Sequence, residues 1–298
     1  MTNFMTKNTD FPDATLRFAL TVACPSAPGQ VAALVRFLDE RGCYIDEFDV
    51  FDDDSTARFF VRCVFHAASA QTLDVSSLRD GFASVASRFD MVWAIHDMSV
   101  RPKVLIMVSK FDHCLADLLF RWRMDEMKMN IVGIVSNHPD LEPLATANRI
   151  AWHHLPLTAD TKSKQEEQVL EVIKRTGAEL VVLARYMQVL SAGLCQRLAG
   201  RAINIHHSFL PGFKGAKPYH QAHARGVKLI GATAHFVTDD LDEGPIIEQV
   251  VERVDHAYNP ERLLATGRDV ECLALARAVK WFIERRTFIN GNRTVVLQ

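Results

Sequence analysis

From Lys103 to its end, the chain alternates short apolar runs with longer amphipathic stretches, and this alternation constrains the fold more than any other feature. The runs typical of buried strands are KVLIMVS, NIVGIVSN, LVVLARYM, AINIHH, IGATAHFV and IIEQVVERV. Between them, KSKQEEQVLEVIKRTG has the spacing of an amphipathic helix that ends at Gly177, and Asn259-Pro260 predicts the start of a long last helix. This order predicts an α/β domain with a mostly parallel sheet.

Residues 15–98 have a different pattern, which predicts a separate small domain. Two helical stretches are interleaved with four strand-like ones in the order β-α-β-β-α-β. That order is typical of ferredoxin-like folds. We place the domain boundary at Arg101-Pro102, with a flexible N-terminus over 1–14, a linker over 99–102 and the second domain over 103–298.

Composition narrows the class of function. The 298 residues suffice for two domains, and a formal net charge of −2 argues against a nucleic-acid binder, which is usually basic. No apolar run approaches the roughly 20 residues of a membrane helix, and the first residues lack the pattern of a signal peptide. The six cysteines form no C-x-x-C pair, which fits a reducing cytoplasm better than a zinc site or a disulfide framework. We expect a cytoplasmic enzyme or regulator with no nucleic-acid or membrane partner.

The stretch INIHHSFLP, residues 203–211, carries polar side chains at the end of an apolar strand, where ligands bind in open α/β sheets. Because strand side chains alternate between faces, Asn204 and His206 are expected on one face and His207 on the other. An amide and an imidazole there can hold a polarised carbonyl, stabilising an oxyanion and donating a proton. A purely structural Asn/His pair explains the same residues, so both interpretations stay open.

An acidic cluster follows the strand in HFVTDDLDEGPII, residues 235–247, and it contains Asp239, Asp240, Asp242 and Glu243. A solvated acidic turn is one interpretation. The other is that one carboxylate turns inward, where burial raises its pKa and lets it act as a base towards water or an amine.

Together these stretches resemble the family of folate-dependent formyltransferases. That family shares N-I-H-x-S-x-L-P followed by H-F-V-x-x-x-x-D-x-G-P, matched here by INIHHSFLP and HFVTDDLDEGP. The resemblance covers about residues 103–290, and it implies that Asn204, His206 and Asp242 are the catalytic trio.

The resemblance also implies a folate pocket around ARYMQVLS, residues 184–191. Purine enzymes of the family usually carry Arg where this chain has Gln188. The residues implied in folate binding are Tyr186, Met187, Gln188, Val189 and Leu190, with Val237, Thr238 and Asp239 closing the pocket.

The formyl acceptor is indicated by VSKFDHCL, residues 108–115. Formyltransferases that act on a phosphorylated amine hold its phosphate at this turn, on backbone N–H groups of a Gly-Ser-Asn-rich segment and a helix N-terminus. Here the turn has no glycine, and Phe111 and Asp112 stand where the anion is held. Without an anchored amine, water is the remaining nucleophile.

The arrangement K-x-x-H-C-L-x-D-L-L from Lys110 onward resembles the formyltetrahydrofolate deformylase family, which also carries an N-terminal ACT domain like residues 15–98. This resemblance implies hydrolysis of 10-formyltetrahydrofolate to tetrahydrofolate and formate, which supplies formate for purine synthesis. The implied partners are the folate substrate and water, with no tightly bound cofactor and no metal. Further residues expected along the site are Lys110, His113, His207, Gly215 and His235.

ACT domains bind small amino acids at subunit interfaces, so the resemblance implies a homo-oligomer and an effector site at Ser26 and Gly29. Relatives carry an acidic residue in this loop where the chain has Ser26. A domain that serves only in oligomerisation is the alternative.

Three other functions stay open on the sequence. Five histidines between 206 and 235, with His220 and His223 three positions apart, leave room for a metal-dependent hydrolase, although there is no H-E-x-x-H. Formyl transfer to an amine such as glycinamide ribonucleotide, or to a charged tRNA, requires a phosphate-binding turn or a basic surface. A non-catalytic ligand sensor built on the ACT domain requires an inert second domain.

Overall fold

The computed structural model describes residues 16–69, 73–210 and 218–298, and it divides into two compact units between Val100 and Arg101. None of the helices in these ranges is long and apolar enough to cross a membrane.

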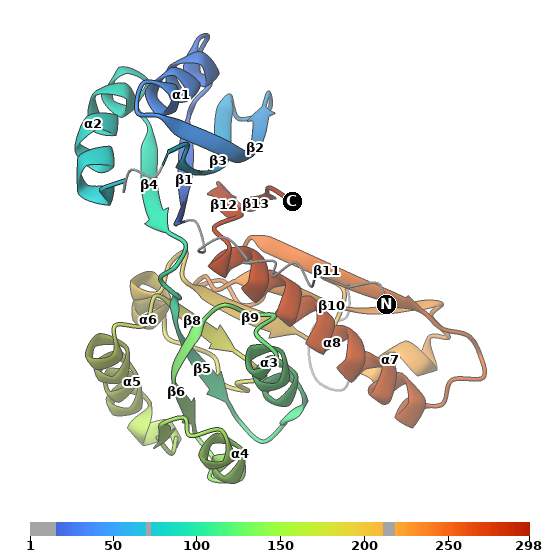
Figure 1. Cartoon of the computed structure of the whole chain (residues 1–298). Helices are drawn as coiled ribbons and strands as arrows, with labels where there is room; N and C mark the ends of the chain where they lie inside the picture. The colour runs from blue at the N-terminus through green and yellow to red at the C-terminus, as the bar shows by residue number, and fades with distance from the viewer. Residues whose placement is uncertain (1–15, 70–72, 211–217) are drawn as a thin grey trace, which may run out of the picture. The chain divides into compact units, whose positions relative to one another are not determined.

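The N-terminal unit is a four-stranded antiparallel sheet with two helices, and it confirms the ferredoxin-like β-α-β-β-α-β order (Figure 1). The strands lie in the order β2-β3-β1-β4. The helices meet through Phe37 of α1 and Phe82 of α2, whose ring centroids are 5.0 Å apart. The elements are β1 (Arg17–Pro25), α1 (Gln30–Asp39), β2 (Cys43–Asp53), β3 (Arg58–Ala67), α2 (Val75–Arg88) and β4 (Val92–Asp97).

The C-terminal unit is built on a seven-stranded sheet in the order β11-β10-β9-β8-β5-β6-β7. The strands from β9 to β7 in that order run parallel, and β10 and β11 are antiparallel at the other edge, so the mostly parallel α/β fold is confirmed. The strands are β5 (Lys103–Val108), β6 (Asn130–Ser136), β7 (Trp152–His154), β8 (Leu180–Leu183), β9 (Ala202–His206), β10 (Leu229–Phe236) and β11 (Ile246–Arg253). The helices are α3 (His113–Arg123), α4 (Glu142–Ala147), α5 (Lys162–Thr176, after the short 3-10 turn Ala159–Thr161), α6 (Ala192–Arg197), α7 (Pro218–Ala224) and α8 (Pro260–Ile283).

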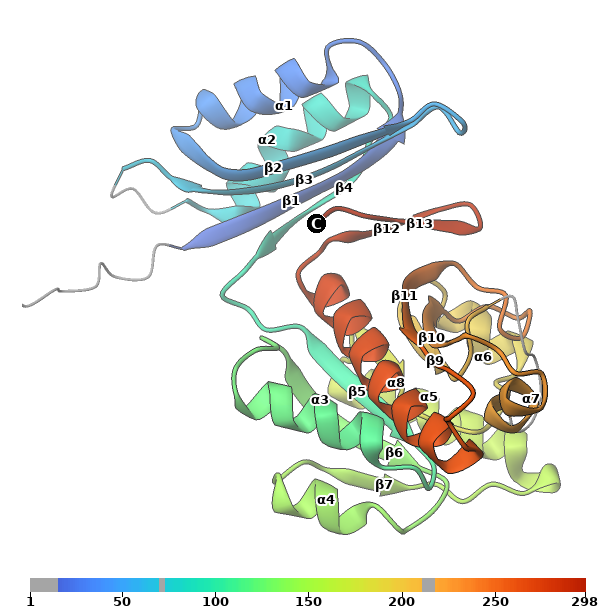
Figure 2. The same cartoon turned by 90° about the vertical axis from the view of Figure 1, so that its right-hand side faces the viewer.

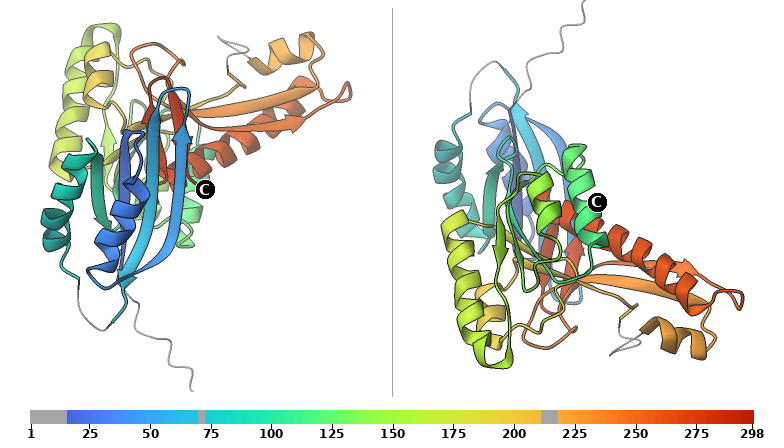
Figure 3. Two further views of the ribbon diagram at one scale, coloured as in Figure 1. Left: turned by 90° about the horizontal axis from the view of Figure 1, so that it is seen from above. Right: turned by 90° about the horizontal axis from the view of Figure 1, so that it is seen from below.

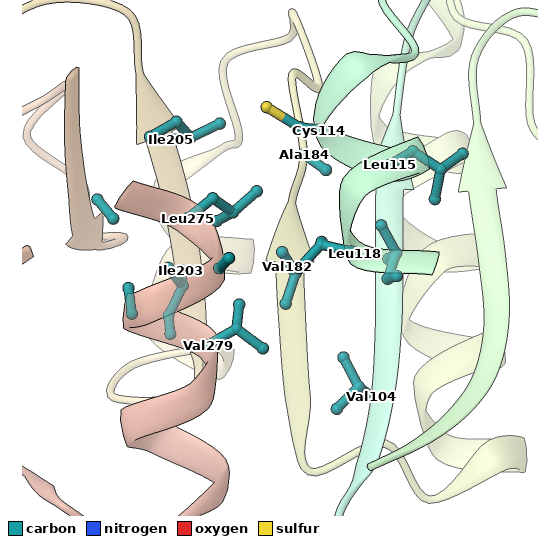
Figure 4. Packing of buried hydrophobic residues seen from close by; sticks show 14 of the residues in the cluster. Val104, Cys114, Leu115, Leu118, Val182, Ala184, Ile203, Ile205, Leu275 and Val279 are labelled. Carbon is teal, nitrogen blue, oxygen red and sulfur yellow. The ribbon is translucent and has the colours of Figure 1, made fainter. Parts of the chain in front are cut away.

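Helices cover both faces of this sheet, which explains why its strands are nearly continuous apolar runs. On one face, α3 and α8 bury Leu118 and Leu275 against β8 and β9 (Figure 4). The opposite face is covered by α5 and α6 (Figures 2 and 3). These helices contribute Val169 and Leu194 to a second core. Burying a Leu or Val side chain contributes about 1.5–3 kcal/mol to stability, so these two cores fix the positions of the strand ends.

Capping residues set the helix limits as predicted. Asn259 accepts a hydrogen bond from Arg262 N at 2.8 Å, and Pro260 is the first residue of α8. Gly177 ends α5 with φ 67°. One strand was predicted too long, because β8 ends at Leu183 and residues 184–191 form a loop at its carboxyl end. The chain also ends in a hairpin, β12 (Thr287–Asn290) and β13 (Arg293–Val296), which the sequence interpretation missed.

Candidate active site

Two neighbouring strands and one loop bring the implied trio together. β9 pairs antiparallel with β10, so that Asn204 lies directly opposite His235, and β9 ends at His206. A register shift between Ala234 and His235 bends β10 at this point, as bulges often do beside active sites. The loop after β10 returns Asp242 to the strand ends, with its Oδ1 3.2 Å from His206 Nδ1.

The return of Asp242 depends on a tight turn. Asp242 itself has φ 59°, in the left-handed region that aspartate tolerates better than most residues. Phe236 N donates a hydrogen bond to Pro245 O at 2.9 Å, which closes the base of the loop. A Cβ on Gly244 would lie 1.7 Å from the Phe236 carbonyl oxygen, so only glycine fits there.

His235 orients the amide of Asn204. Its Nδ1 lies 2.9 Å from the Phe236 carbonyl oxygen, which only accepts, so Nδ1 carries the proton. His235 Nε2 is then free to accept a hydrogen bond from Asn204 Nδ2 at 3.2 Å. Because Asn204 Nδ2 has two protons, one remains for a ligand.

The Asp242 carboxylate is ionised, and the expectation of a raised pKa is wrong. Burial alone raises the pKa of Asp242, but the hydrogen bond and the charge of His206 outweigh burial and hold that pKa well below the usual range. His206 directs Nδ1 to this carboxylate, whereas its Nε2 is buried without a hydrogen-bond partner among the described residues. A buried nitrogen of this kind is the atom available to a reactant.

His207 lies in the same cleft as His206, so the expectation that it points away is wrong. The strand ends at His206, and the alternation of faces ends with it. The two imidazole rings stack with centroids 5.1 Å apart. Burial, together with the charges of Arg185 and His206, lowers the pKa of His207 to about 4, so His207 is neutral near pH 7.

A cleft of about 260 Å³ joins Asn204, His206 and Asp242 to the loop after β8. Met187, Val189 and Leu241 are exposed apolar side chains along it, which is typical of a binding surface. The residues implied in folate binding all line this cleft: Tyr186, Met187, Gln188, Val189, Leu190, Val237, Thr238 and Asp239.

Hydrogen bonds hold the loop after β8 in place. Met187 N donates to Ser109 Oγ at 3.0 Å, and Ser109 Oγ donates to Asn137 Oδ1 at 2.7 Å. Gln165 Nε2 donates to the hydroxyl of buried Tyr186 at 2.9 Å. The loop is therefore tied to the ends of β5 and β6 and to α5, which preorganises the wall of the cleft.

Two further expected residues lie elsewhere. Lys110 is exposed and His113 pairs with Glu271, and neither lines the cleft. Gly215 falls outside the described residues. In the N-terminal unit, Ser26 Oγ donates a hydrogen bond to Asp52, and Gly29 precedes α1 with φ 87°.

A buried charged cluster beside the cleft was missed by the sequence interpretation. Glu271 of α8 is only 1% exposed and accepts hydrogen bonds from Tyr219 OH at 2.9 Å and from His113 Nε2 at 2.9 Å. Arg185 Nε lies 3.4 Å from the same carboxylate. Burial raises the pKa of Glu271, but His113 and Arg185 outweigh it and lower that pKa. A lone Glu in the apolar stretch VECLALA and an Arg directly after an apolar strand were the available signals.

This charged cluster includes three atoms that are able to ligate a metal, from His113, Cys114 and Glu271, all within 4.8 Å of one another. The guanidinium of Arg185 stands beside them, and the His113–Glu271 hydrogen bond already occupies two of the ligand groups. A metal cation in this position is disfavoured because it would lie beside the positive charge of Arg185. His220 and His223 are both exposed on α7.

Comparison with known proteins shows which families this chain resembles in sequence and in structure. The Formyl transferase family model matches residues 102–279. Formyltetrahydrofolate deformylase of Corynebacterium sp. (strain P-1) is 53% identical over 95% of this chain and 99% of its own length. The crystal structure of formyltetrahydrofolate deformylase from Burkholderia mallei ATCC 23344 is 71% identical, with a TM-score of 0.91 over 95% of this chain and 100% of that one. Glycinamide ribonucleotide transformylase 1 from Symbiobacterium toebii is 29% identical, with a TM-score of 0.63 over 66% of this chain and 95% of that one.

Proposed function

This chain belongs to the formyltetrahydrofolate deformylase family, and we propose that it hydrolyses 10-formyltetrahydrofolate to tetrahydrofolate and formate in the cleft described above. One observation carries the choice of site. Asn204, His206 and Asp242 come from two elements and face a single cleft, whose other wall is the loop after β8.

The folate seat in this scheme is the apolar part of the cleft. The pterin ring lies against Met187, Val189 and Leu190, and the loop from Val237 to Asp239 closes over it. The cleft of about 260 Å³ lies below the roughly 300–1,000 Å³ that encloses a drug-sized ligand, so only the pterin end is enclosed. The rest of the folate extends into solvent.

The reaction follows from the hydrogen bonds of the trio. Water adds to the formyl carbon, and the oxyanion that forms is stabilised by Asn204 Nδ2 and by a proton on His206 Nε2. Collapse breaks the bond between the formyl carbon and N10, and the Nε2 proton passes to N10. Formate leaves as an anion, so the added water gives up two protons in all: one replaces the proton that His206 passed to N10, and the other goes to solvent. Because the pKa of Asp242 is low, its carboxylate holds His206 and positions the water and does not itself retain a proton.

Water is the acceptor in this scheme because the described residues beside the trio form no binding site for a phosphorylated amine. The turn that binds phosphate in amine transferases is occupied here by Phe111, by Asp112 and by His113, which is engaged with Glu271. The scheme uses only the folate and water and requires no tightly bound cofactor.

Incubation with 10-formyltetrahydrofolate, with and without glycinamide ribonucleotide, tests the assignment. Formate release that is independent of the amine supports hydrolysis. Formyl transfer that requires the amine would overturn it and favour the alternative of an amine transferase.

We further propose that the reaction takes place in the cytoplasm and supplies formate for purine synthesis. We assign residues 15–98 as an ACT domain that acts in homo-oligomerisation and regulation, joined by the linker 99–102 to the catalytic domain 103–298. Ser26 and Gly29 are the candidate residues for an amino-acid effector. Equilibrium dialysis with single amino acids tests that role, and a Ser26→Ala variant that binds an effector unchanged would remove Ser26 from it.

A further inference from the structure

Arg185 lines the cleft, and its buried guanidinium has donors with no acceptor among the described residues. Its side chain is about 10% exposed, and it is the one arginine or lysine among the described residues that line the cleft. Its Nε and Nη1 are buried and have no hydrogen-bond partner within the described ranges. Buried N–H groups of a guanidinium are costly to leave without an acceptor, so an acceptor supplied by a ligand is implied.

Glu271 balances the charge of Arg185 without satisfying its donors. The carboxylate already accepts hydrogen bonds from His113 and Tyr219. Arg185 Nε lies 3.4 Å from Glu271 Oε2, in an orientation that makes no hydrogen bond. The guanidinium also lies over the Phe111 ring, 5.2 Å from its centroid, which fixes its plane. The guanidinium is therefore held in place with hydrogen-bonding capacity to spare.

We propose that Arg185 binds formate as the anion forms, an inference that rests on the proposed hydrolysis. The formyl group is neutral before the reaction and carries a negative charge afterwards, so a fixed cation interacts more strongly with the product side. A guanidinium matches a planar carboxylate in shape and makes short, charge-assisted hydrogen bonds to it. Arg185 lines the same cleft as the stacked rings of His206 and His207, so this cation lies along the cleft in which formate is made.

The carboxylates of the folate tail are the competing ligand for this arginine. They belong to the part of the substrate that extends into solvent, whereas Arg185 is buried. Asp239 and Asp240 are exposed acidic residues along the cleft, and they repel such a tail. The observations therefore favour the small anion that is made in the cleft.

Titration of sodium formate into the free protein, against sodium chloride at equal ionic strength, tests the site directly. Saturation-transfer NMR on the formate proton gives the dissociation constant without any turnover. Wild-type protein is compared with R185Q, E271Q and R185Q/E271Q. The double variant removes both members of the buried pair and leaves no unpaired buried charge, so it decides the outcome if R185Q fails to fold.

We expect R185Q and R185Q/E271Q to bind formate at least about tenfold more weakly than wild type, because charge-assisted hydrogen bonds are lost. E271Q keeps Arg185 and removes a competing anion, so its affinity is expected to equal or exceed that of wild type. Formate affinity within twofold of wild type in R185Q/E271Q overturns the inference, as does loss of formate binding in E271Q. A raised KM for the folate with unchanged formate affinity assigns Arg185 to the folate tail and also overturns it.

These measurements test the formate site and the proposed hydrolysis independently of each other. If the protein binds formate through Arg185 but releases no formate from 10-formyltetrahydrofolate, the anion site is supported and the deformylase function is not. If the protein hydrolyses 10-formyltetrahydrofolate but its formate affinity is the same with and without Arg185, the deformylase function is supported and the formate site is not.

Discussion

The carboxylate of Asp242 and the imidazole of His206 meet through Oδ1 and Nδ1 at 3.2 Å, and this contact determines which nitrogen of His206 faces the cleft. The two residues are 36 positions apart in the sequence, and each comes from a different strand end or loop. Because Nδ1 is engaged, Nε2 is left for the formyl oxygen and for N10. The pair therefore acts as one unit in the proposed reaction.

Asp242→Asn is expected to lower kcat by about 10²–10⁴, the usual contribution of a positioned acid–base group, because the amide holds His206 without the negative charge. KM for 10-formyltetrahydrofolate is expected to stay within a few-fold, since Asp242 does not touch the pterin seat in the proposed scheme. Steady-state formate release measures both constants. Asp269→Asn, on the exposed face of α8, is the matched control and keeps normal activity. Full turnover in Asp242→Asn would remove Asp242 from the mechanism.

His235 is a positioning residue, and its replacement is expected to act through Asn204. His235→Phe removes the acceptor of the Asn204 amide proton and lowers kcat by up to about 10², the size of one oxyanion donor, with little change in KM. His235→Gln restores an acceptor oxygen and recovers part of kcat. A purely structural role predicts that both variants lose stability and activity in parallel. Thermal unfolding measured beside kcat separates the two cases.

The sequence predicted the fold because each local signal agreed with the packing. Buried strands appear as apolar runs, and Asn259, Pro260 and Gly177 sit at helix ends where their chemistry is required. The trio was predictable in the same way, because Asn204 and His206 alternate along one strand and the Asp242 turn follows the next strand in space.

Long-range partners were not predictable from the sequence. Glu271 meets His113 and Tyr219, which are 158 and 52 positions away, and no local pattern names those partners. The pKa of Asp242 was misjudged for the same reason. A cluster of acids suggests a raised pKa, but His206, which the loop after β10 brings against Asp242, lowers it. The position of His207 was missed because the strand ends one residue earlier than the pattern indicated.

Gly244→Ala is expected to displace the turn that carries Asp242. Its Cβ would lie 1.7 Å from the Phe236 carbonyl oxygen, so the backbone must move, at a cost of about 1–3 kcal/mol or more. We expect kcat to fall by at least about tenfold together with the urea midpoint, because catalysis is sensitive to shifts of about 1 Å. Gly193→Ala, where the nearest atom is 4.0 Å away, is the matched control and changes neither quantity appreciably. Equal behaviour of the two variants would contradict the proposed role of the turn.

His207 makes stability depend on pH between about 6.5 and 4. Its pKa is lowered from 6.5 to about 4 by burial and by nearby positive charge, so it stays neutral in the folded protein while the unfolded chain takes up a proton. The unfolded state then binds more protons, and stability falls as pH decreases through this window. At pH 5 the loss from His207 is about 2 kcal/mol, at 1.36 kcal/mol per pKa unit. His207→Gln lacks this group, so between pH 7 and pH 5 it is expected to lose about 2 kcal/mol less stability than wild type in urea unfolding. Exposed His256→Gln should follow the wild-type pH dependence, and parallel curves for His207→Gln and wild type would show that His207 is free to take up a proton in the folded protein.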